Sequence, residues 1–318
     1  HRRARVSAGL PPLAGASARS KARGIMAAIG CIALFGVSQG MTHPLIGLRL
    51  ELAGWSTTAI GFNAAMVAVA ALVATPVMPR IIGRIGLPAF LAAGGVLSSA
   101  MLALFPVYEG YGAWMILRFL QGVAAAMLFV GSEAWIVGAA EPRTRGRVVG
   151  FYATVLSLGF AAGPMIVTAT GIEGDAPFFI CAALALVCIP PLVAAWRDAP
   201  PPERAQPGSA GAYHHLRANP TVMGAVVLFG AIEFGIMGLL PVWGVRTGLD
   251  ADRASFLVSA LILGNVALQI PLGALADRGR RRAIFVFCAL SCLVAAAALP
   301  ALAGTSWPLW ATLFVWGG

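Results

Sequence analysis

Charged residues are scarce in this chain. Asp, Glu, Lys and Arg together make up 11% of its 318 residues, and Lys21 is the one lysine among its 22 basic residues. Soluble domains carry about 25% charged residues, so this chain has too few charges to cover a globule of its size. The shortage excludes an ordinary water-soluble enzyme. The 59% of apolar residues exclude an intrinsically disordered chain.

Cysteine is also rare, with five residues in the whole chain. All five lie in apolar stretches, where a free cysteine is usually a small buried side chain: Cys31, Cys181, Cys188, Cys288 and Cys292. The chain lacks the metal-binding motifs C-x-x-C and H-E-x-x-H, and it lacks a phosphate-binding P-loop. We therefore expect no cofactor, no metal site and no ATP-hydrolysing unit.

Long apolar runs dominate what is present, and the mean hydropathy is +0.85. A helix needs about 20 apolar residues to span a bilayer. Nine runs satisfy this and a tenth begins at the end of the chain: 25–48, 58–78, 87–107, 112–139, 148–171, 176–196, 221–244, 254–276, 283–303 and 307–318. The sequence predicts an all-α membrane protein that contacts the lipid bilayer along most of its length.

The basic residues alternate between successive loops. If the N-terminus is cytoplasmic, 18 basic residues fall on the cytoplasmic side, and Arg49, Arg246 and Arg253 fall on the other. Cytoplasmic loops of membrane proteins carry an excess of Lys and Arg. We therefore predict a multi-pass protein of the bacterial inner membrane with a cytoplasmic N-terminus. Because the charges flank the spans, the net charge of +10 does not indicate a nucleic-acid partner.

One long polar stretch divides the chain, and its Pro, Gly and Ser content is typical of a linker. The chain begins with His1 and ends about 12 residues into an apolar run, so we expect it to be incomplete. The predicted divisions are a cytoplasmic tail over 1–23, a six-helix half over 24–196, a cytoplasmic linker over 197–220 and an incomplete second half over 221–318.

Two loops occupy equivalent places in the two halves. PRIIGRIG (79–86) follows the second span, and GALADRGRRR (273–282) follows the eighth. Parallel repeats of this kind mark one class of secondary transporter. The spacing therefore indicates two six-helix halves, of which ten helices are represented here.

Four motifs, in order, resemble the major facilitator superfamily. The loop at residues 273–282 resembles its motif G-x-L-x-D-R-x-G-R-R, with Arg280 in place of a Gly. The fourth span resembles its motif R-x-x-Q-G-x-x-A, with the residues Arg118-Phe-Leu-Gln121-Gly122-Val-Ala-Ala. Gly150-x8-Gly159-x3-Gly163-Pro164 resembles the start of a pattern associated with antiporters. Ser132-Glu133-Ala-Trp135, followed by 145–152, is similar to a poorly characterised bacterial branch of that superfamily.

The resemblance, over 25–318, implies the major facilitator fold and a monomeric secondary transporter that moves a small organic solute by alternating access. Coupling to H⁺ follows from the missing ATP-hydrolysing unit, and the third motif favours export. A membrane sensor or scaffold without flux is the alternative, because Pro79 and Gly83 depart from the loop motif in the first half. Catalysis at Gly36-Val-Ser38-Gln-Gly40, which matches the hydrolase motif G-x-S-x-G, is rejected because that motif works on a strand-to-helix turn.

Three charged residues fall inside spans: Arg118, Glu133 and Glu233. A charge at the bilayer centre costs about 2.5–3.5 kcal/mol on insertion scales, so each is a functional candidate. Glu233 lies 12 residues into the seventh span, where a carboxyl held away from water keeps its proton more readily. We expect Glu233 to serve proton coupling or substrate contact. Glu133 lies either in the membrane or at its inner interface.

Uncharged polar residues also recur within the spans. Gln39 and His43, in the first span, and Asn265 and Gln269, in the eighth, are pairs four residues apart, and Asn63 lies in the second span. Residues four apart share a helix face. We predict that these faces line a central cavity; the alternative for each residue is a hydrogen bond between helices.

Two further sets of residues suggest moving parts. We predict that Asp277 and Arg278, with Arg84 and Gly86 of the first loop, form a gating latch; the alternative is that these charges only set the orientation. Small residues let helix backbones approach closely, and proline bends a helix. We therefore predict that a second set of residues forms a helix-packing seam on which the halves rock; the alternative is plain tight packing. The set comprises Gly122, Gly150, Gly159, Gly163 and Pro164.

Overall fold

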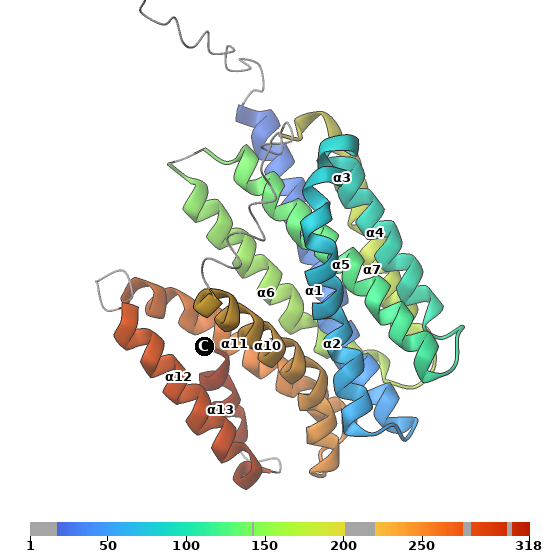
Figure 1. The fold of residues 1–318 in the computed structure, drawn as a ribbon, viewed down its shortest axis with the longest axis vertical. Helices are drawn as coiled ribbons and strands as arrows, with labels where there is room; N and C mark the ends of the chain where they lie inside the picture. The colour runs from blue at the N-terminus through green and yellow to red at the C-terminus, as the bar shows by residue number, and fades with distance from the viewer. Residues whose placement is uncertain (1–17, 142, 201–219, 276–280, 304–306) are drawn as a thin grey trace, which may run out of the picture.

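The structure is a computed structural model that describes residues 18–141, 143–200, 220–275, 281–303 and 307–318. Nearly all of these residues are helical, and none of them forms a strand. Figure 1 shows the long helices running side by side as two groups. The all-α prediction is confirmed.

The six predicted spans of the first half each correspond to a helix or to helices in direct succession. These are α1 (Ala18–Leu52), α2 (Thr57–Ala74) continued by η1 (Thr75–Val77) and α3 (Met78–Ile85), α4 (Leu87–Leu104), α5 (Tyr111–Ala139), α6 (Arg145–Thr170), and α7 (Ala176–Val187) followed by α8 (Ile189–Ala194). Gly86 joins α3 directly to α4 with a φ of +80°, a conformation that glycine adopts without steric cost.

The second half continues after the short turn η2 (Trp196–Asp198). Its helices are α10 (Pro220–Arg246), α11 (Ala251–Leu275), α12 (Arg281–Ala298), the turn η4 (Leu299–Leu302) and α13 (Trp307–Gly317). Within the described residues, eight helices are long and apolar enough to cross a membrane. The multi-pass architecture predicted from the apolar runs is therefore confirmed.

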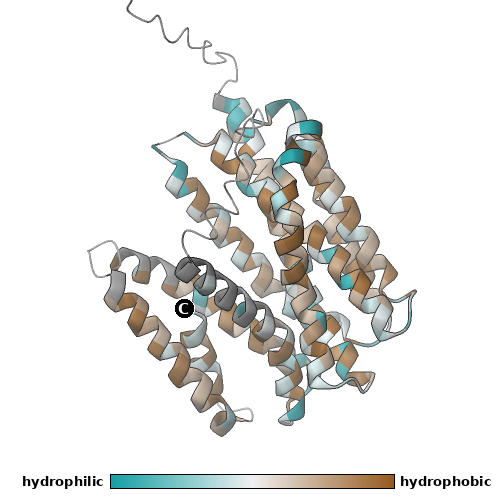
Figure 2. Ribbon diagram, in the orientation of Figure 1, coloured by the Kyte–Doolittle hydropathy of each residue, from teal (hydrophilic) through white to brown (hydrophobic). Residues whose placement is uncertain are grey.

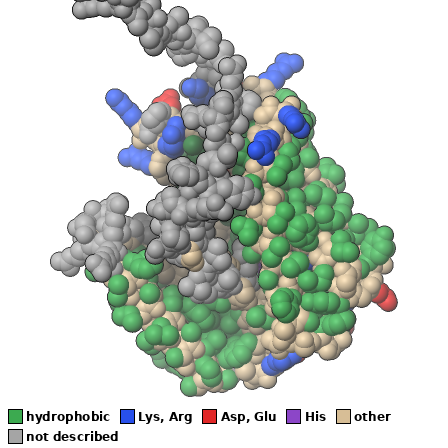
Figure 3. All heavy atoms as spheres, in the orientation of Figure 1, with side chains coloured by type: hydrophobic (Ala, Val, Ile, Leu, Met, Phe, Trp, Pro, Cys, Tyr) green, Lys and Arg blue, Asp and Glu red, His purple; other side chains and the backbone are tan. Residues whose placement is uncertain are grey.

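The two ends of the bundle differ in charge. We call one the linker end, formed by 18–23, 80–86, 140–147 and 196–200, and the other the far end, formed by 52–57, 105–110, 171–175 and 246–250. Figure 3 shows most of the visible Lys and Arg side chains at the linker end and a broad apolar flank between the two ends. In Figure 2 the helix bodies are predominantly hydrophobic, and hydrophilic residues concentrate near their ends.

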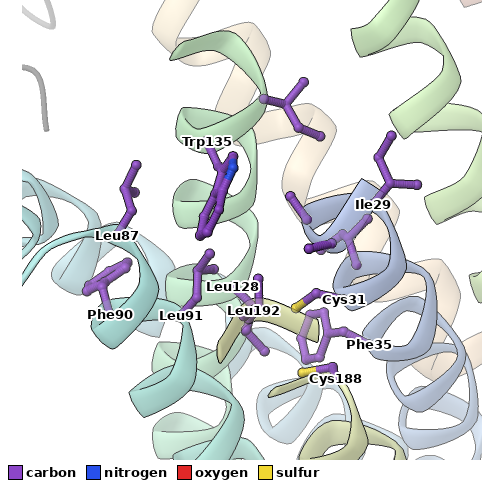
Figure 4. Packing of buried hydrophobic residues seen from close by; sticks show 14 of the residues in the cluster. Ile29, Cys31, Phe35, Leu87, Phe90, Leu91, Leu128, Trp135, Cys188 and Leu192 are labelled. Carbon is purple, nitrogen blue, oxygen red and sulfur yellow. The ribbon is translucent and has the colours of Figure 1, made fainter. Parts of the chain in front are cut away.

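A cluster of large apolar side chains near the linker end holds the first half together. Phe35 of α1, Phe90 of α4 and Trp135 of α5 are fully buried there, and Figure 4 shows Cys31 and Cys188 beside Phe35. Buried aromatic side chains supply large apolar area for packing. This cluster fixes α5 against α1, and thereby positions the polar side chains farther along both helices.

Backbone-to-backbone packing joins α1 to α6. Gly36 and Gly40 of α1 lie against Gly159 and Gly163 of α6, so each helix presents two glycines four residues apart to the other. A Cβ atom built on Gly159 would lie 2.7 Å from the carbonyl oxygen of Ala33. Close approach at small residues is a common way for membrane helices to associate. The glycine face of α6 therefore packs within the first half.

The other side of α6 meets the second half. Ser259 of α11 donates a hydrogen bond to the carbonyl oxygen of Ala161 at 2.8 Å, and Thr168 donates to the carbonyl oxygen of Asp252 at 3.3 Å. By contrast, Phe151 in the first turns of α6 is exposed, and Figure 1 shows these turns standing clear of the second half. The halves therefore meet along the part of α6 nearer the far end.

Candidate functional site

The most deeply buried charge in the described chain is Arg118, in the second turn of α5. Its side chain is 1% exposed and meets His43 of α1, which is 2% exposed. The distance from Arg118 Nη2 to His43 Nδ1 is 2.8 Å. Arginine has no acceptor atom, so the guanidinium donates and Nδ1 accepts. His43 is therefore the neutral tautomer, with its hydrogen on Nε2, and its ring stacks on Phe160 of α6 at 6.3 Å between centroids.

A second polar pair lies one turn closer to the linker end on the same two helices. The side-chain amide of Gln121 donates to Oε1 of Gln39, and both residues are buried. The helices run antiparallel, so the four-residue spacing of Gln39 and His43 matches the three-residue spacing of Arg118 and Gln121. Ser38, beside them, donates to the carbonyl oxygen of Cys181 at 2.9 Å. The structure thus brings Gln39 and His43, which the sequence placed on one polar helix face, together with Arg118 and with Gln121, which was not a candidate.

A small cavity adjoins Arg118 where the two halves meet. It is lined by residues of the first half together with Gly238 of α10: His43, Ile46, Gly47, Leu50, Ile60, Asn63, Ala64 and Arg118. Asn63 Nδ2 donates to the carbonyl oxygen of Trp114 at 3.4 Å. The cavity offers about 10 Å³ to water centres, and one water needs roughly 10–15 Å³ on that measure. In this conformation the cavity has no room for an organic solute.

The charge on Arg118 is not neutralised by another described residue. The described ion pairs within 4.0 Å join Arg23 to Asp198, Arg49 to Asp175 and Arg246 to Glu51. Arg118 Nε and Nη1 are buried and have no hydrogen-bond partner among the described residues. Buried charges in proteins are usually paired. This site therefore has donors and a positive charge to offer to an acceptor from outside those residues.

The two candidate carboxylates lie elsewhere, and the protein does not bury either of them. Glu133, six residues before the end of α5, and Glu233, near the middle of α10, are both exposed. The role of Glu233 in proton coupling or substrate contact therefore stays a prediction. Glu233 shares a helix face with Met237 and Leu240, which are one and two turns farther along α10 and pack in the core of the second half.

The remaining polar candidates divide between described and undescribed residues. Asn265 of α11 is exposed, whereas Asn63 is buried. Asp277 and Arg278, and the side chain of Gln269, lie outside the described residues. The latch and the eighth-span polar face therefore stay predictions.

The glycine and loop candidates have different surroundings. A Cβ on Gly122 of α5 would lie 2.9 Å from the backbone of Val67 in α2, so this glycine allows close packing within the first half. Gly150 differs from Gly159 and Gly163, because a Cβ built on it would meet no atom within 4 Å. Pro164 is buried within α6. Arg84 is exposed at the linker end.

Sequence reasoning missed an interaction between the halves at the far end. Arg246 of α10 donates from Nε to Oε1 of Glu51 at 2.7 Å and from Nη2 to Oε2 at 2.9 Å. Its Nη1 also donates to Oγ1 of Thr57 at 2.6 Å. Close by, a Cβ built on Gly47 would lie 2.6 Å from the carbonyl oxygen of Gly238. These contacts close the far end, and they join residues too distant in the sequence for any local pattern to indicate them.

A second missed interaction lies at the linker end. Asp198, just after the last helix of the first half, accepts a hydrogen bond from Arg23 Nε at 2.6 Å and another from the hydroxyl of Ser20. These hydrogen bonds, that from Arg23 first, lower the pKa of Asp198 below its ordinary value. The bonded carboxylate ties the start of α1 to the point where the chain leaves the first half.

Comparison with known proteins agrees with this architecture. Residues 24–318 match the family model described as Major Facilitator Superfamily. The uncharacterized MFS-type transporter YfkF of Bacillus subtilis is 26% identical over 260 residues, covering 80% of this chain and 66% of its own length. The uncharacterized MFS-type transporter YcaD of Escherichia coli is 24% identical over 256 residues, covering 80% and 67%. The chain thus spans about two thirds of the length of these relatives.

Solved structures share the fold. The nucleoside transporter NupG, as a D323A mutant, superposes with a TM-score of 0.76 at 13% identity, covering 94% of this chain and 79% of that one. A bacterial homolog of the human lysosomal transporter Spinster, inward-facing and unoccupied, gives a TM-score of 0.67 at 15% identity, covering 95% and 72%. At these identities the likeness establishes the fold and carries no information on the substrate.

Proposed function

The chain belongs to the major facilitator superfamily, and from this membership we propose that it is a secondary active transporter of a small organic solute. The observation that carries the proposal is the buried polar cluster of Arg118, His43, Gln39 and Gln121 beside the junction of the halves. Polar and charged side chains are costly within a membrane bundle, and where they persist they usually mark a pathway or a site.

The proposed mechanism is alternating access. The halves rock about α6, which packs on α1 with its glycines and on α11 with Ala161 and Thr168. With the Glu51–Arg246 pair formed, the far end is closed and the central site opens toward the linker end. Breaking that pair lets the far end open, and Asp277 and Arg278 then hold the linker end closed.

We assign coupling to protons and the coupling role to Glu233. Its carboxyl lies near the middle of α10, on the face that continues into Met237 and Leu240, so a change in its charge acts on the packing of the second half. The absence of a P-loop in this sequence and the glycine pattern of the fifth span support a proton-driven exporter. The basic loops support a cytoplasmic linker end in a bacterial inner membrane, and we infer a monomer.

The test compares two carboxyl variants in everted membrane vesicles. Acidification of the vesicles by respiration is followed with a pH-sensitive dye, and release of protons is recorded on addition of an organic acid (benzoate), an organic cation (ethidium) or a neutral nucleoside (inosine). We expect one probe to release protons from wild-type vesicles, and Glu233→Gln to abolish that release. Glu109→Gln, at an exposed residue of the far end, is the control and should behave as wild type.

Two results would change the account. Full proton-linked flux in Glu233→Gln would remove Glu233 from coupling and leave it a surface residue. Saturable binding of a probe without flux in any preparation would instead support a membrane sensor or scaffold built on a transporter fold.

A further inference from the structure

We propose that Arg118 binds the negatively charged group of an oxyanion, such as a carboxylate or a phosphate, in the cavity between the halves. The inference rests on the proposed transport function for its physiological meaning, and it narrows the solute to an anionic one. Its starting point is the mismatch between a guanidinium that is 1% exposed and the lack of a carboxylate within 4.0 Å of it among the described residues.

The hydrogen-bond geometry leaves the guanidinium partly unused. One nitrogen, Nη2, donates to His43, and Nε and Nη1 have no acceptor in the described part of the chain. Because His43 accepts at Nδ1, it is neutral there and does not supply the missing negative charge. A planar guanidinium with free N–H groups matches the two oxygens of a carboxylate or phosphate.

The cavity is placed for a ligand that enters as the halves separate. Arg118 lines it from the first half and Gly238 lines it from the second. At present it holds about 10 Å³ for water centres, which is close to the roughly 10–15 Å³ that one water occupies. The contact of Gly47 with Gly238 closes it. Movement of α10 away from α1 enlarges the cavity and brings Arg118 within reach of a solute from the far end.

Asn63 adds a further polar group to the same wall. Its amide faces the carbonyl oxygen of Trp114 at 3.4 Å, a long hydrogen bond that a better acceptor can replace. The apolar remainder of the lining, with Ile46, Leu50 and Ile60, suits the hydrocarbon part of an organic acid. The site therefore fits an amphipathic organic anion better than a free inorganic ion.

The test is a binding experiment that needs neither a gradient nor flux. Purified full-length chain in detergent is heated with sodium benzoate, with benzamide as the uncharged analogue, or with sodium phosphate, at constant ionic strength. We expect benzoate to raise the Tm of the wild type saturably, by on the order of 5 °C at about 100 times Kd, and benzamide to leave it unchanged. Arg118→Gln should abolish the response, and Arg143→Gln, at an exposed arginine of the linker end, should keep it.

Each outcome bears on the proposal. A response to phosphate and not to benzoate supports the oxyanion site and assigns it to an inorganic ion. An equal response in Arg118→Gln, or no response to either anion in the wild type, overturns the proposal. If Arg118→Gln does not fold, Arg118→Lys keeps the charge without the planar fork, and unchanged benzoate affinity in that variant also overturns it. Anion binding without transport would refute the proposed function and leave the site intact.

Discussion

Adding a single methyl group at Gly159 should destabilise the protein, because no space exists for it between α1 and α6. A Cβ at this position would lie 2.7 Å from the carbonyl oxygen of Ala33 and 3.1 Å from the amide nitrogen of Val37. Ordinary contact begins at 3.4 Å, so the helices must separate by the difference, about 0.7 Å. Both neighbouring atoms belong to the backbone, so neither can rotate away.

The expected magnitude combines two effects of Gly159→Ala. Overpacking a tight contact costs about 1–3 kcal/mol, whereas alanine is favoured over glycine within a helix by about 1 kcal/mol. Gly150→Ala, in the same helix, has the second effect alone, since a Cβ there meets no atom within 4 Å. The difference between the two variants therefore isolates the steric cost of about 1–3 kcal/mol.

The assay is thermal unfolding of the two purified variants, followed by the fluorescence of the eight tryptophans. At about 2–4 °C per kcal/mol, Gly159→Ala should unfold roughly 2–12 °C below Gly150→Ala. Equal unfolding temperatures for the two variants would refute the reasoning, because they would mean that α1 and α6 do not touch backbone to backbone.

Three further predictions follow from other contacts. Arg246→Gln and Glu51→Gln should each open the far end more often, which would lengthen the distance between spin labels placed there. The double variant should lengthen it no further than either single variant, and additive effects would contradict the ion pair. The hydrogen bonds to Asp198 lower its pKa. Its carboxylate should therefore stabilise the fold at any pH above the ordinary Asp pKa of about 3.9. The Tm of the wild type should exceed that of Asp198→Asn at pH 7, and this difference should disappear as the pH falls through the lowered pKa of Asp198. An equal Tm difference at pH 7 and pH 3 would contradict the prediction. Arg118→Ala should abolish solute flux in vesicles, and normal flux would make Arg118 a packing residue.

The helices were largely predictable because apolar runs are a local signal. The run 112–139 corresponds to α5 (Tyr111–Ala139) almost residue for residue. The run 58–78 ended too early, because α3 (Met78–Ile85) is amphipathic. It buries Met78 and Ile82 and exposes Arg80 between them and Arg84 after them, and averaged hydropathy does not detect such a turn. The start of α1 was likewise missed, since Arg23 there is held by a hydrogen bond to Asp198 and not by apolar packing.

The sequence allowed the polar helix faces of the site to be predicted, but not the hydrogen-bonded pairs that form between them. The four-residue spacing of Gln39 and His43 identified one polar face, and the structure places both residues inside the bundle. Their partners lie 82 and 75 positions away, and no spacing in the sequence encodes a contact over that distance. The glycines of α1 were weighed only as part of a hydrolase motif, which was rejected, and their packing signal was missed. Gly36 and Gly40 have the same four-residue spacing as Gly159 and Gly163, which they contact.

Alternating access is the central claim, and distances between the halves test it directly. Spin labels on cysteines introduced at Ala53 and Asp250 report the far end, and labels at Arg147 and Ala283 report the linker side; all four positions are exposed. In a cysteine-free full chain in lipid nanodiscs, the two distances should be measured with and without benzoate. The account predicts opposite changes, with the far-end distance increasing as the linker-side distance decreases. Two distances that stay fixed, or that change in the same direction, would contradict it.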